Sequence, residues 1–223
     1  MSETSLNNLA DGAQPNARPN VLMICVDQWP AALQRAEGHP SVVAPTLHQL
    51  ASNGIRFTRA YSTCPVCGPA RRSLMTGLGV QSQGPRENLN QPMPAVTTLA
   101  QAFTNSGYHT TAIGKLHAWP PRARLGFSET RIAEEGRCYE EGRRPDDYEL
   151  YLADQGFAGQ YHSSGMAQND YLARPWHLSE HCHPTHWAAT EMCRAIQRRD
   201  PTRPAFWYLS FAGPHPPLMP LCD

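Results

Sequence analysis

The chain enters its first predicted strand with VLMICV (residues 21–26), which is followed at once by Asp27 and Gln28. A continuous apolar run of this length is typical of a strand buried on both faces of a parallel sheet. The abrupt change to polar side chains marks the carboxyl end of that strand. This stretch therefore predicts an α/β fold built on a parallel sheet.

The sequence on either side of this strand continues an alternation of strands and helices. Apolar or alternating segments predict three further strands, and periodic segments with Pro or Gly at their ends predict four helices. Residues 118–180 are rich in Pro, Gly and charged residues, and no helix or strand is predicted there. The predicted strands are 55–61 (IRFTRAY), 108–113 and 205–211 (AFWYLSF), and the predicted helices are 45–54, 70–77, 97–105 and 184–199.

Composition narrows the classes of function. The 223 residues carry 19 Lys and Arg against 19 Asp and Glu, so the formal net charge is zero. This balance argues against a nucleic-acid partner and against a polybasic membrane binder, since both depend on excess positive charge. Apolar runs fall well short of the roughly 20 residues of a membrane-spanning helix, so we expect no membrane association. A hydrophobic content of 40% predicts a globular chain.

The first 19 residues are polar and lack the apolar core of a secretory signal. We therefore expect a disordered leader over residues 1–19, one folded unit over residues 20–223, and a cytoplasmic location. Seven cysteines are an odd and scattered set, which predicts free or buried thiols rather than a disulfide scaffold.

Three of the predicted strands run directly into polar side chains. Asp27 and Gln28 follow the first strand, Lys115 and His117 follow the strand at 108–113, and His215 follows the last strand. Ligands of open α/β sheets bind outside the carboxyl ends of the strands. We therefore expect a carboxylate, an ammonium group and two imidazoles to converge on one edge of the sheet.

The segment CGPARRSLMTG (residues 67–77) places Cys67 next to the start of a predicted helix. The positive end of the helix dipole and the nearby Arg71 would both favour an anion there. The pair Cys64 and Cys67 also allows a redox pair or half of a zinc site.

A zinc site would need a second pair of ligands, and the segment that contains Cys182, His183 and His186 is the available source. His181, His183 and His186 lie beside Pro184 and Thr185. That context favours helix capping and surface packing for the three histidines.

The segment that begins at Cys67 resembles the type I sulfatase signature, Cys-x-Pro-x-Arg followed by a Leu-x-Thr-Gly element. The matching residues are Cys67, Pro69, Arg71, Leu74, Thr76 and Gly77. Residues 20–27, 114–117 and 203–217 are similar to other elements of that family, so the likeness covers roughly residues 19–220. It implies an alkaline-phosphatase-like fold, a mainly parallel sheet flanked by helices.

The resemblance implies a sulfuric ester hydrolase that cleaves a small-molecule sulfate monoester. In such enzymes a formylglycine-generating enzyme oxidises the signature cysteine to formylglycine, whose hydrate attacks sulfur. The chemistry requires an activated oxygen nucleophile and positive charge around the sulfuryl oxygens. It also implies a bound divalent cation with oxygen ligands, Ca²⁺ first, with Mg²⁺ or Mn²⁺ as alternatives.

Roles follow from the resemblance residue by residue. Asp27 and Gln28 would be metal ligands, and Cys67, as formylglycine, would be both nucleophile and metal ligand. Arg71 would orient and polarise the hydrated aldehyde.

The remaining site residues would contact the substrate. Lys115 and His117 would contact the sulfate and the nucleophile, and His215 would contact the sulfate or the leaving oxygen. Asn88 is a further candidate for the pocket wall, by likeness to phosphonate-hydrolase relatives. Because Lys115, His117, His215 and Arg71 would share one cavity, we expect that cavity to need an anion.

Two alternatives remain open at this point. The Asp27-Gln28 pair is also similar to phosphonate monoester hydrolases of the same superfamily, so a phosphonate or phosphodiester hydrolase is the nearest one. Lys115 and His117 favour a sulfatase, because those hydrolases tend to carry neutral hydroxyl residues there. Family members are about twice as long and place further metal ligands beyond this stretch. We therefore expect an incomplete, truncated N-terminal half, and a non-catalytic remnant is the second alternative.

Overall fold

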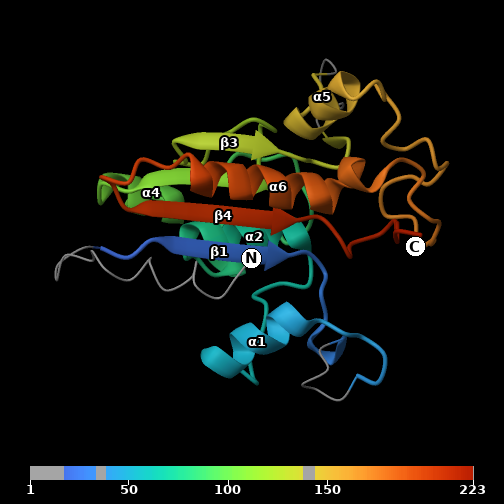
Figure 1. The fold of residues 1–223 in the computed structure, drawn as a ribbon. Helices are drawn as coiled ribbons and strands as arrows, with labels where there is room; N and C mark the ends of the chain where they lie inside the picture. Colours follow the sequence, from blue (N-terminus) through green and yellow to red (C-terminus); the bar gives the residue numbers. More distant parts are fainter. Residues whose placement is uncertain (1–17, 34–38, 138–143, 223) are drawn as a thin grey trace.

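A computed structural model describes a four-stranded sheet in which every neighbouring pair of strands is parallel, in the order β1-β4-β2-β3 (Figure 1). The strands are β1 (Val21–Val26), β2 (His109–Gly114), β3 (Glu129–Ile132) and β4 (Ala205–Phe211). The described residues are 18–33, 39–137 and 144–222. Most of the predicted leader, residues 1–17, lies outside them.

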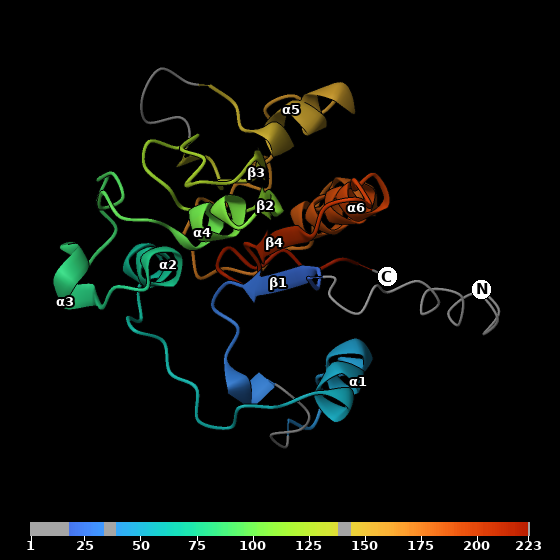
Figure 2. The ribbon, with the colours of Figure 1, turned by 90° about the vertical axis from the view of Figure 1, so that its left-hand side faces the viewer.

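Helices cover both faces of this sheet. Figure 2 shows α6 on one face and α2 with α4 on the other, while α5 lies beside β3. This arrangement confirms the predicted fold class. The helices are α1 (Pro45–Asn53), α2 (Cys67–Thr76), α3 (Val80–Gln83), α4 (Leu99–Asn105), α5 (Asp147–Asp154) and α6 (Pro184–Gln197), with short 3-10 turns η3 (Ala31–Leu33) and η6 (Glu180–Cys182).

Strand β4 divides two apolar cores because its side chains alternate between the faces of the sheet. Trp207 and Leu209 belong to the core beneath α5 and α6, together with Trp187 of α6. Phe206 and Tyr208 belong to the core beneath α2 and α4. Full burial of such side chains stabilises a fold by about 1.5–3 kcal/mol each, so β4 anchors both layers.

Several sequence predictions are confirmed at the level of single elements. Strands β1 and β4 have the predicted bounds, and β2 is displaced by one residue. Helix α2 begins at Cys67 itself rather than after it. Strand β3 and helix α5 lie in the segment left unassigned. A capping box of Asp146 and Glu149 starts α5, and that pattern is readable in the sequence.

The predicted strand over residues 55–61 is wrong. The structure has no strand there, and Ile55, Phe57 and Tyr61 are between 79% and 87% exposed. Alternation of apolar residues indicates how a strand would divide its faces, but a strand forms only beside a partner. No strand among the described residues pairs with this segment.

The expectation that β1 is buried on both faces is also wrong. Strand β1 is an edge strand, paired with β4 on one side. Leu22 and Ile24 are about half exposed, whereas Val21, Met23 and Cys25 pack against the core beneath α2 and α4. One face of this apolar strand therefore lies open in the described part of the chain.

Gly114 allows the end of β2 to approach β4 closely. Its φ is +95°, and a Cβ atom there would overlap the carbonyl oxygen of Ser210. The next residue, Lys115, donates its backbone N–H to that same oxygen at 2.9 Å. Only glycine satisfies both the backbone conformation and the contact.

Replacing Gly114 with alanine should lower the free energy of unfolding by more than about 2 kcal/mol, because backbone strain and overlap add. Gly79→Ala is the control, since its Cβ would meet open space at an ordinary φ. Gly79→Ala should lower the free energy of unfolding by at most about 1 kcal/mol. Urea unfolding of both variants measures the difference, and equal losses would contradict the role given to Gly114.

Candidate active site

The polar ends of β1, β2 and β4 meet at one edge of the sheet, as the sequence predicts. The Asp27 N–H donates to Phe211 O at 3.1 Å, and the Lys115 N–H donates to Ser210 O at 2.9 Å. His215 follows β4 by four residues and lines the same cavity as Asp27. Parallel topology therefore brings residues from distant parts of the chain together.

Arg71 of α2 ties that helix to the end of the sheet. Its Nη1 donates to the carbonyl oxygen of Lys115 at 2.6 Å and to the hydroxyls of Ser210 and Tyr208 at 2.9 and 3.2 Å. Its Nη2 lies 3.5 Å from Oδ2 of Asp27. The guanidinium is buried and thereby held in one orientation.

Lys115 is completely buried between two carboxylates. Its ammonium group forms ion pairs with Oδ2 of Asp27 and, at 2.8 Å, with Oε2 of Glu135. Burial alone would raise the pKa of Asp27, but the positive charges of Lys115 and Arg71 outweigh it and lower that pKa. Asp27 is therefore kept ionised.

Glu135 and Arg137 belong to the site although the sequence analysis missed them. Arg137 lies 2.8 Å from Oε2 of Glu135 and 2.8 Å from Oε2 of Glu134. Burial opposes ionisation of Glu135, yet Lys115 and Arg137 lower its pKa to about 2. These carboxylates correct the expectation that the basic side chains need a bound anion, because the protein supplies the negative charge itself.

Glu134 shapes the turn that follows β2. Its Oε1 accepts the backbone N–H groups of Leu116 at 2.7 Å and of His117 at 2.9 Å. His117 adopts a φ of +54°, which is uncommon outside glycine. The carboxylate thus holds a strained turn and sets the direction of the imidazole.

The His117 ring is neutral and has an unused nitrogen. Burial lowers its pKa to about 2, with further contributions from Arg137 and Lys115. Its Nδ1 is buried and makes no hydrogen bond with another described residue. Buried polar atoms of this kind are usually satisfied, so His117 Nδ1 is an exception among the described residues.

Cys67 is the first residue of α2 and lies against Asn88. The Asn88 Nδ2 lies 3.5 Å from Sγ of Cys67, and its Oδ1 accepts the Gly68 N–H at 2.9 Å. A Cβ atom at position 68 would lie 2.6 Å from that oxygen, so a larger residue there would displace the Asn88 amide. Asn88 therefore satisfies one of the free N–H groups at the helix start.

Most residues predicted for the site line connected cavities. One cavity of about 970 Å³ is lined by Asp27, Gln28, Cys67, Arg71, Asn88 and His215. A second of about 420 Å³ shares Cys67, Asn88 and His215 with it and adds His117. Lys115 lines neither, because its ammonium group lies behind Asp27.

The site contains oxygen donors of the type that a divalent cation prefers. Asp27 offers a carboxylate and Gln28 an amide oxygen beside Cys67, and hard cations such as Ca²⁺ and Mg²⁺ prefer oxygen ligands. Such cations take six or more ligands. Over the part of the chain that the structure describes, there is no group of three or more His, Cys, Asp or Glu side chains that could hold a metal ion.

The histidines near α6 have structural roles. His183 is the N-cap of α6, with its Nδ1 accepting the Thr185 N–H at 3.2 Å and its Nε2 3.0 Å from Met219 O. His186 lies 3.7 Å from Glu180. The predicted capping is confirmed for His183, whose ring nitrogens are both engaged by protein atoms.

Replacing Glu135 with glutamine should lower the free energy of unfolding at pH 7 by about 3 kcal/mol, because Lys115 and Arg137 lose a buried partner. A carboxyl with a depressed pKa stabilises the fold above its ordinary value of 4.5. This contribution is lost as the pH falls from 4.5 towards 2.

The difference between wild type and Glu135→Gln should therefore shrink over that same interval. Urea unfolding at pH 7, 4.5 and 3 measures it. Glu129→Gln is the control, since Glu129 is exposed and its ion pair in the described part of the chain is with His109, at 3.4 Å. A pH-independent loss in Glu135→Gln would show that charge is not the cause.

Comparison with known proteins gives the family of this chain. The Sulfatase family model matches residues 19–222. An arylsulfatase of Clostridium perfringens is 32% identical over 215 residues, which are 91% of this chain and 44% of that protein. A sulfatase of Formosa agariphila is 30% identical, over 90% of this chain and 40% of that protein. The chain spans less than half the length of these relatives.

Solved structures share the fold. The phosphonate monoester hydrolase of Agrobacterium radiobacter superposes with a TM-score of 0.69 at 27% identity, over 91% of this chain and 42% of that one. A protein solved with D-glucosamine-2-N,6-O-disulfate as its substrate superposes with a TM-score of 0.68 at 19% identity, which shows a shared fold alone. Since the family model matches nearly every residue, and the strand ends, Cys67 and the parallel sheet agree with it, the chain belongs to the sulfatase family.

Proposed function

We propose that the protein carrying this chain hydrolyses a sulfate monoester with formylglycine, formed from Cys67, as its nucleophile. The observation that carries this proposal is the place of Cys67, at the start of α2 and in one cavity with Asp27, Arg71 and His215. Relatives named arylsulfatase and choline-sulfatase support the same reaction class. The substrate is a small-molecule sulfate ester.

The chain's own groups favour a sulfuryl anion beside position 67. The N–H groups at the start of α2 carry the positive end of the helix dipole, and Arg71 adds a fixed positive charge. His117 lines the adjoining cavity. Fixed donors and charges of this kind stabilise the charge that develops on transferring groups.

Asp27 and Gln28 would hold a divalent cation, with position 67 as a further ligand. Ca²⁺ is the first choice for oxygen donors, followed by Mg²⁺ and Mn²⁺. When bound, the cation supplies positive charge against the oxygens of the ester. Lys115 and Arg71 serve this site indirectly, because they keep Asp27 ionised and fixed.

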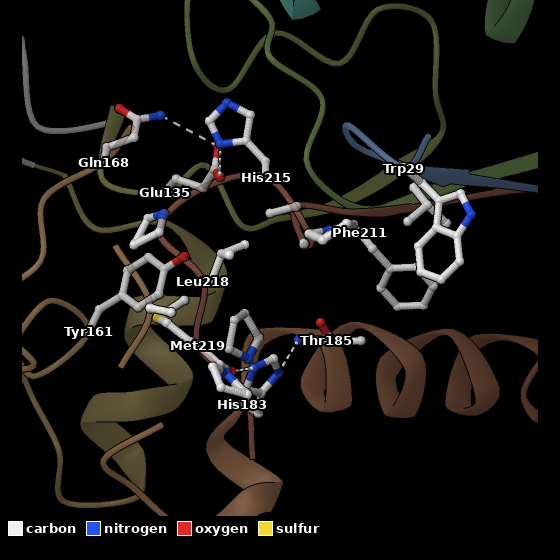
Figure 3. Close-up of a pocket in the computed structure, with 18 of the residues that line it drawn as sticks. Trp29, Glu135, Tyr161, Gln168, His183, Thr185, Phe211, His215, Leu218 and Met219 are labelled. Carbon is white, nitrogen blue, oxygen red and sulfur yellow. Dashed lines mark hydrogen bonds and ion pairs between the residues drawn. The ribbon is translucent and has the colours of Figure 1, made fainter. Parts of the chain in front are cut away.

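His215 is suited to contact the leaving oxygen. Its Nδ1 lies 2.8 Å from Pro216 O and 3.6 Å from Oε1 of Glu135 (Figure 3). A proton on Nδ1 is thereby held between two acceptors, and the second ring nitrogen on the other side of the imidazole is left for the substrate. To donate a proton to the leaving oxygen, this second nitrogen must itself be protonated, so the acid form of His215 would be the imidazolium, with an N–H on each ring nitrogen.

Maturation provides the direct test. In a host with a formylglycine-generating enzyme, the tryptic peptide between Arg59 and Arg71 should carry an aldehyde at Cys67 and an unmodified thiol at Cys64. The maturation enzyme supplies the oxidant, and the thiol sulfur is lost. Mass analysis of that peptide decides the point. Two unmodified cysteines from such a host would contradict the proposal.

A phosphonate monoester hydrolase is the second candidate function. The similarity to the Agrobacterium radiobacter enzyme and the Asp27-Gln28 pair favour it. Lys115 and His117 at the end of β2 favour sulfate. Rates with a matched aryl sulfate and aryl phosphonate, measured on one preparation, separate the two functions. A larger kcat/KM for the phosphonate would reverse the order proposed here.

A further inference from the structure

A further cavity of about 500 Å³, mainly apolar, lies beside His215 (Figure 3). Its walls are made by carbon-rich side chains of the β4–α6 region and of the segment after His215, among them Phe211, Leu218 and Met219. We name it the Tyr161 cavity, after the tyrosine on its wall. Its volume lies within the range of small-molecule binding sites.

The Tyr161 cavity adjoins the candidate active site. Val26, Trp29 and His215 line both it and the cavity that contains Cys67. His215, the group suited to the leaving oxygen, thus stands at the boundary between them. An ester with its sulfate beside Cys67 and its bridging oxygen at His215 would direct its carbon skeleton into the Tyr161 cavity.

Tyr161 gives the cavity an unused polar group. Its side chain is only 6% exposed, and its hydroxyl forms no hydrogen bond among the contacts of the described residues. Figure 3 shows this hydroxyl directed into the cavity, towards Leu218. Burial raises the pKa of Tyr161 well above its ordinary value, so the hydroxyl keeps its proton. Buried tyrosine hydroxyls usually have a partner, and here a ligand would supply it.

The polar corner of the cavity is already occupied by protein contacts. Glu135 is paired with Lys115 and Arg137, and Gln168 donates to Oε2 of Glu135 at 3.5 Å. The rest of the wall offers mainly carbon atoms to a ligand, although Trp29, whose Nε1 has no hydrogen-bond partner among the described residues, also lines it. A sugar ring would lose the hydration of its hydroxyls there with few replacement hydrogen bonds, which is costly. A flat apolar ring would lose nothing of this kind and would gain from burial.

We propose that the Tyr161 cavity binds the leaving alcohol of the ester. It selects an apolar, aromatic alcohol of one or two rings with a hydrogen-bond acceptor opposite its ester oxygen, in preference to a sugar. This proposal rests on the proposed sulfatase function and adds the class of substrate. The acceptor would meet the Tyr161 hydroxyl, and the ring would lie between Trp29, Phe211 and Leu218.

Leu218→Gln tests the apolar wall, and Leu221→Gln is its matched control. The two leucines are 42% and 43% exposed and lie three residues apart, but only Leu218 lines the cavity. In the natural full-length protein, Leu218→Gln should raise KM for 4-acetylphenyl sulfate about fivefold or more, whereas Leu221→Gln should leave it unchanged. Inhibition by inorganic sulfate should be the same in both, since it reports the Cys67 cavity alone.

Tyr161→Phe tests the hydroxyl while keeping the ring. It should raise KM for 4-acetylphenyl sulfate severalfold and leave KM for phenyl sulfate unchanged. Glucosamine 6-sulfate should have a kcat/KM at least tenfold below that of the aryl ester in the wild type. Equal effects of Leu218→Gln and Leu221→Gln, equal effects of Tyr161→Phe on both aryl esters, or a preferred sugar sulfate would each overturn the proposal.

A binding measurement keeps the two proposals distinguishable. Calorimetric titration with 4-hydroxyacetophenone, the alcohol alone, should show one site that Leu218→Gln weakens and Leu221→Gln does not. If the alcohol binds in this way but no sulfate ester is hydrolysed, the proposed reaction fails and the cavity stands as an aromatic-alcohol site. If inorganic sulfate inhibits but the alcohol does not bind, for instance because another protein segment fills the cavity, the cavity proposal fails alone.

Discussion

Replacing Cys67 with alanine should lower kcat/KM for an aryl sulfate by roughly a thousandfold or more, because the variant has no group that can become the nucleophile. The fold should persist, since the thiol makes only weak contacts with Asn88, at 3.5–3.7 Å, and lies partly exposed in its cavity. The measurement is initial-rate kinetics, with circular dichroism and urea unfolding to verify the fold.

Cys64→Ala is the matched control for this prediction. Cys64 precedes the start of α2 by three residues and lines the same cavity, but its thiol lies 3.9 Å from the carbonyl oxygen of Arg86. It should keep kcat/KM within about twofold of the wild type, since a factor of two is only about 0.4 kcal/mol of transition-state binding. Comparable losses in both variants would indicate a redox pair, and full activity in Cys67→Ala would remove the proposed nucleophile.

Lys115→Ala should have the second-largest effect, on both stability and turnover. Removing the ammonium group leaves the buried carboxylates of Asp27 and Glu135 without their shared partner, which costs about 3–5 kcal/mol of folding free energy. Displacement of Asp27 should lower kcat/KM for an aryl sulfate by more than tenfold, that is, by more than about 1.4 kcal/mol. Urea unfolding and kinetics well below the melting temperature measure the two effects.

The control for Lys115→Ala is a basic residue in a surface ion pair. Arg122 lies 3.2 Å from Asp147 and is 44% exposed. Such pairs contribute at most about 1 kcal/mol, so Arg122→Ala should change stability little and turnover not at all. If Lys115→Ala behaves like Arg122→Ala, Lys115 is not the central charge of the site.

The sequence predicts the site best where a reactive or charged residue directly follows a predicted strand. Asp27, Lys115 and His215 follow apolar runs, and parallel strands place their carboxyl ends on one edge. Cys67 is predictable from its motif. The roles of Glu135 and Arg137 are not predictable, because these residues lie in an irregular segment where no periodicity indicates which way a side chain points. Their contribution depends on turns with positive φ, which Glu135 itself adopts.

The fold is predictable where a local sequence pattern also determines how a strand pairs with its neighbours. Strand β4 is apolar on both faces and is central, as its sequence indicates. Strand β1 has the same pattern but lies at the edge, and residues 55–61 have the alternation of a strand without becoming one. In both cases the pattern records which side chains are apolar, whereas strand pairing and burial depend on neighbouring strands that the pattern does not specify.

The strand order also has a consequence for the time course of folding. Among the described residues, strand β1 pairs with β4 alone, and Asn20 just before it accepts the Ala205 N–H across 185 residues of chain. Contacts between such distant residues form slowly, because closing the loop between them costs entropy. Strands β2 and β3 can pair early, but β1 has to wait for β4. Asp27 would therefore reach Lys115 last, and the site would acquire its balance of charge only when the sheet is complete.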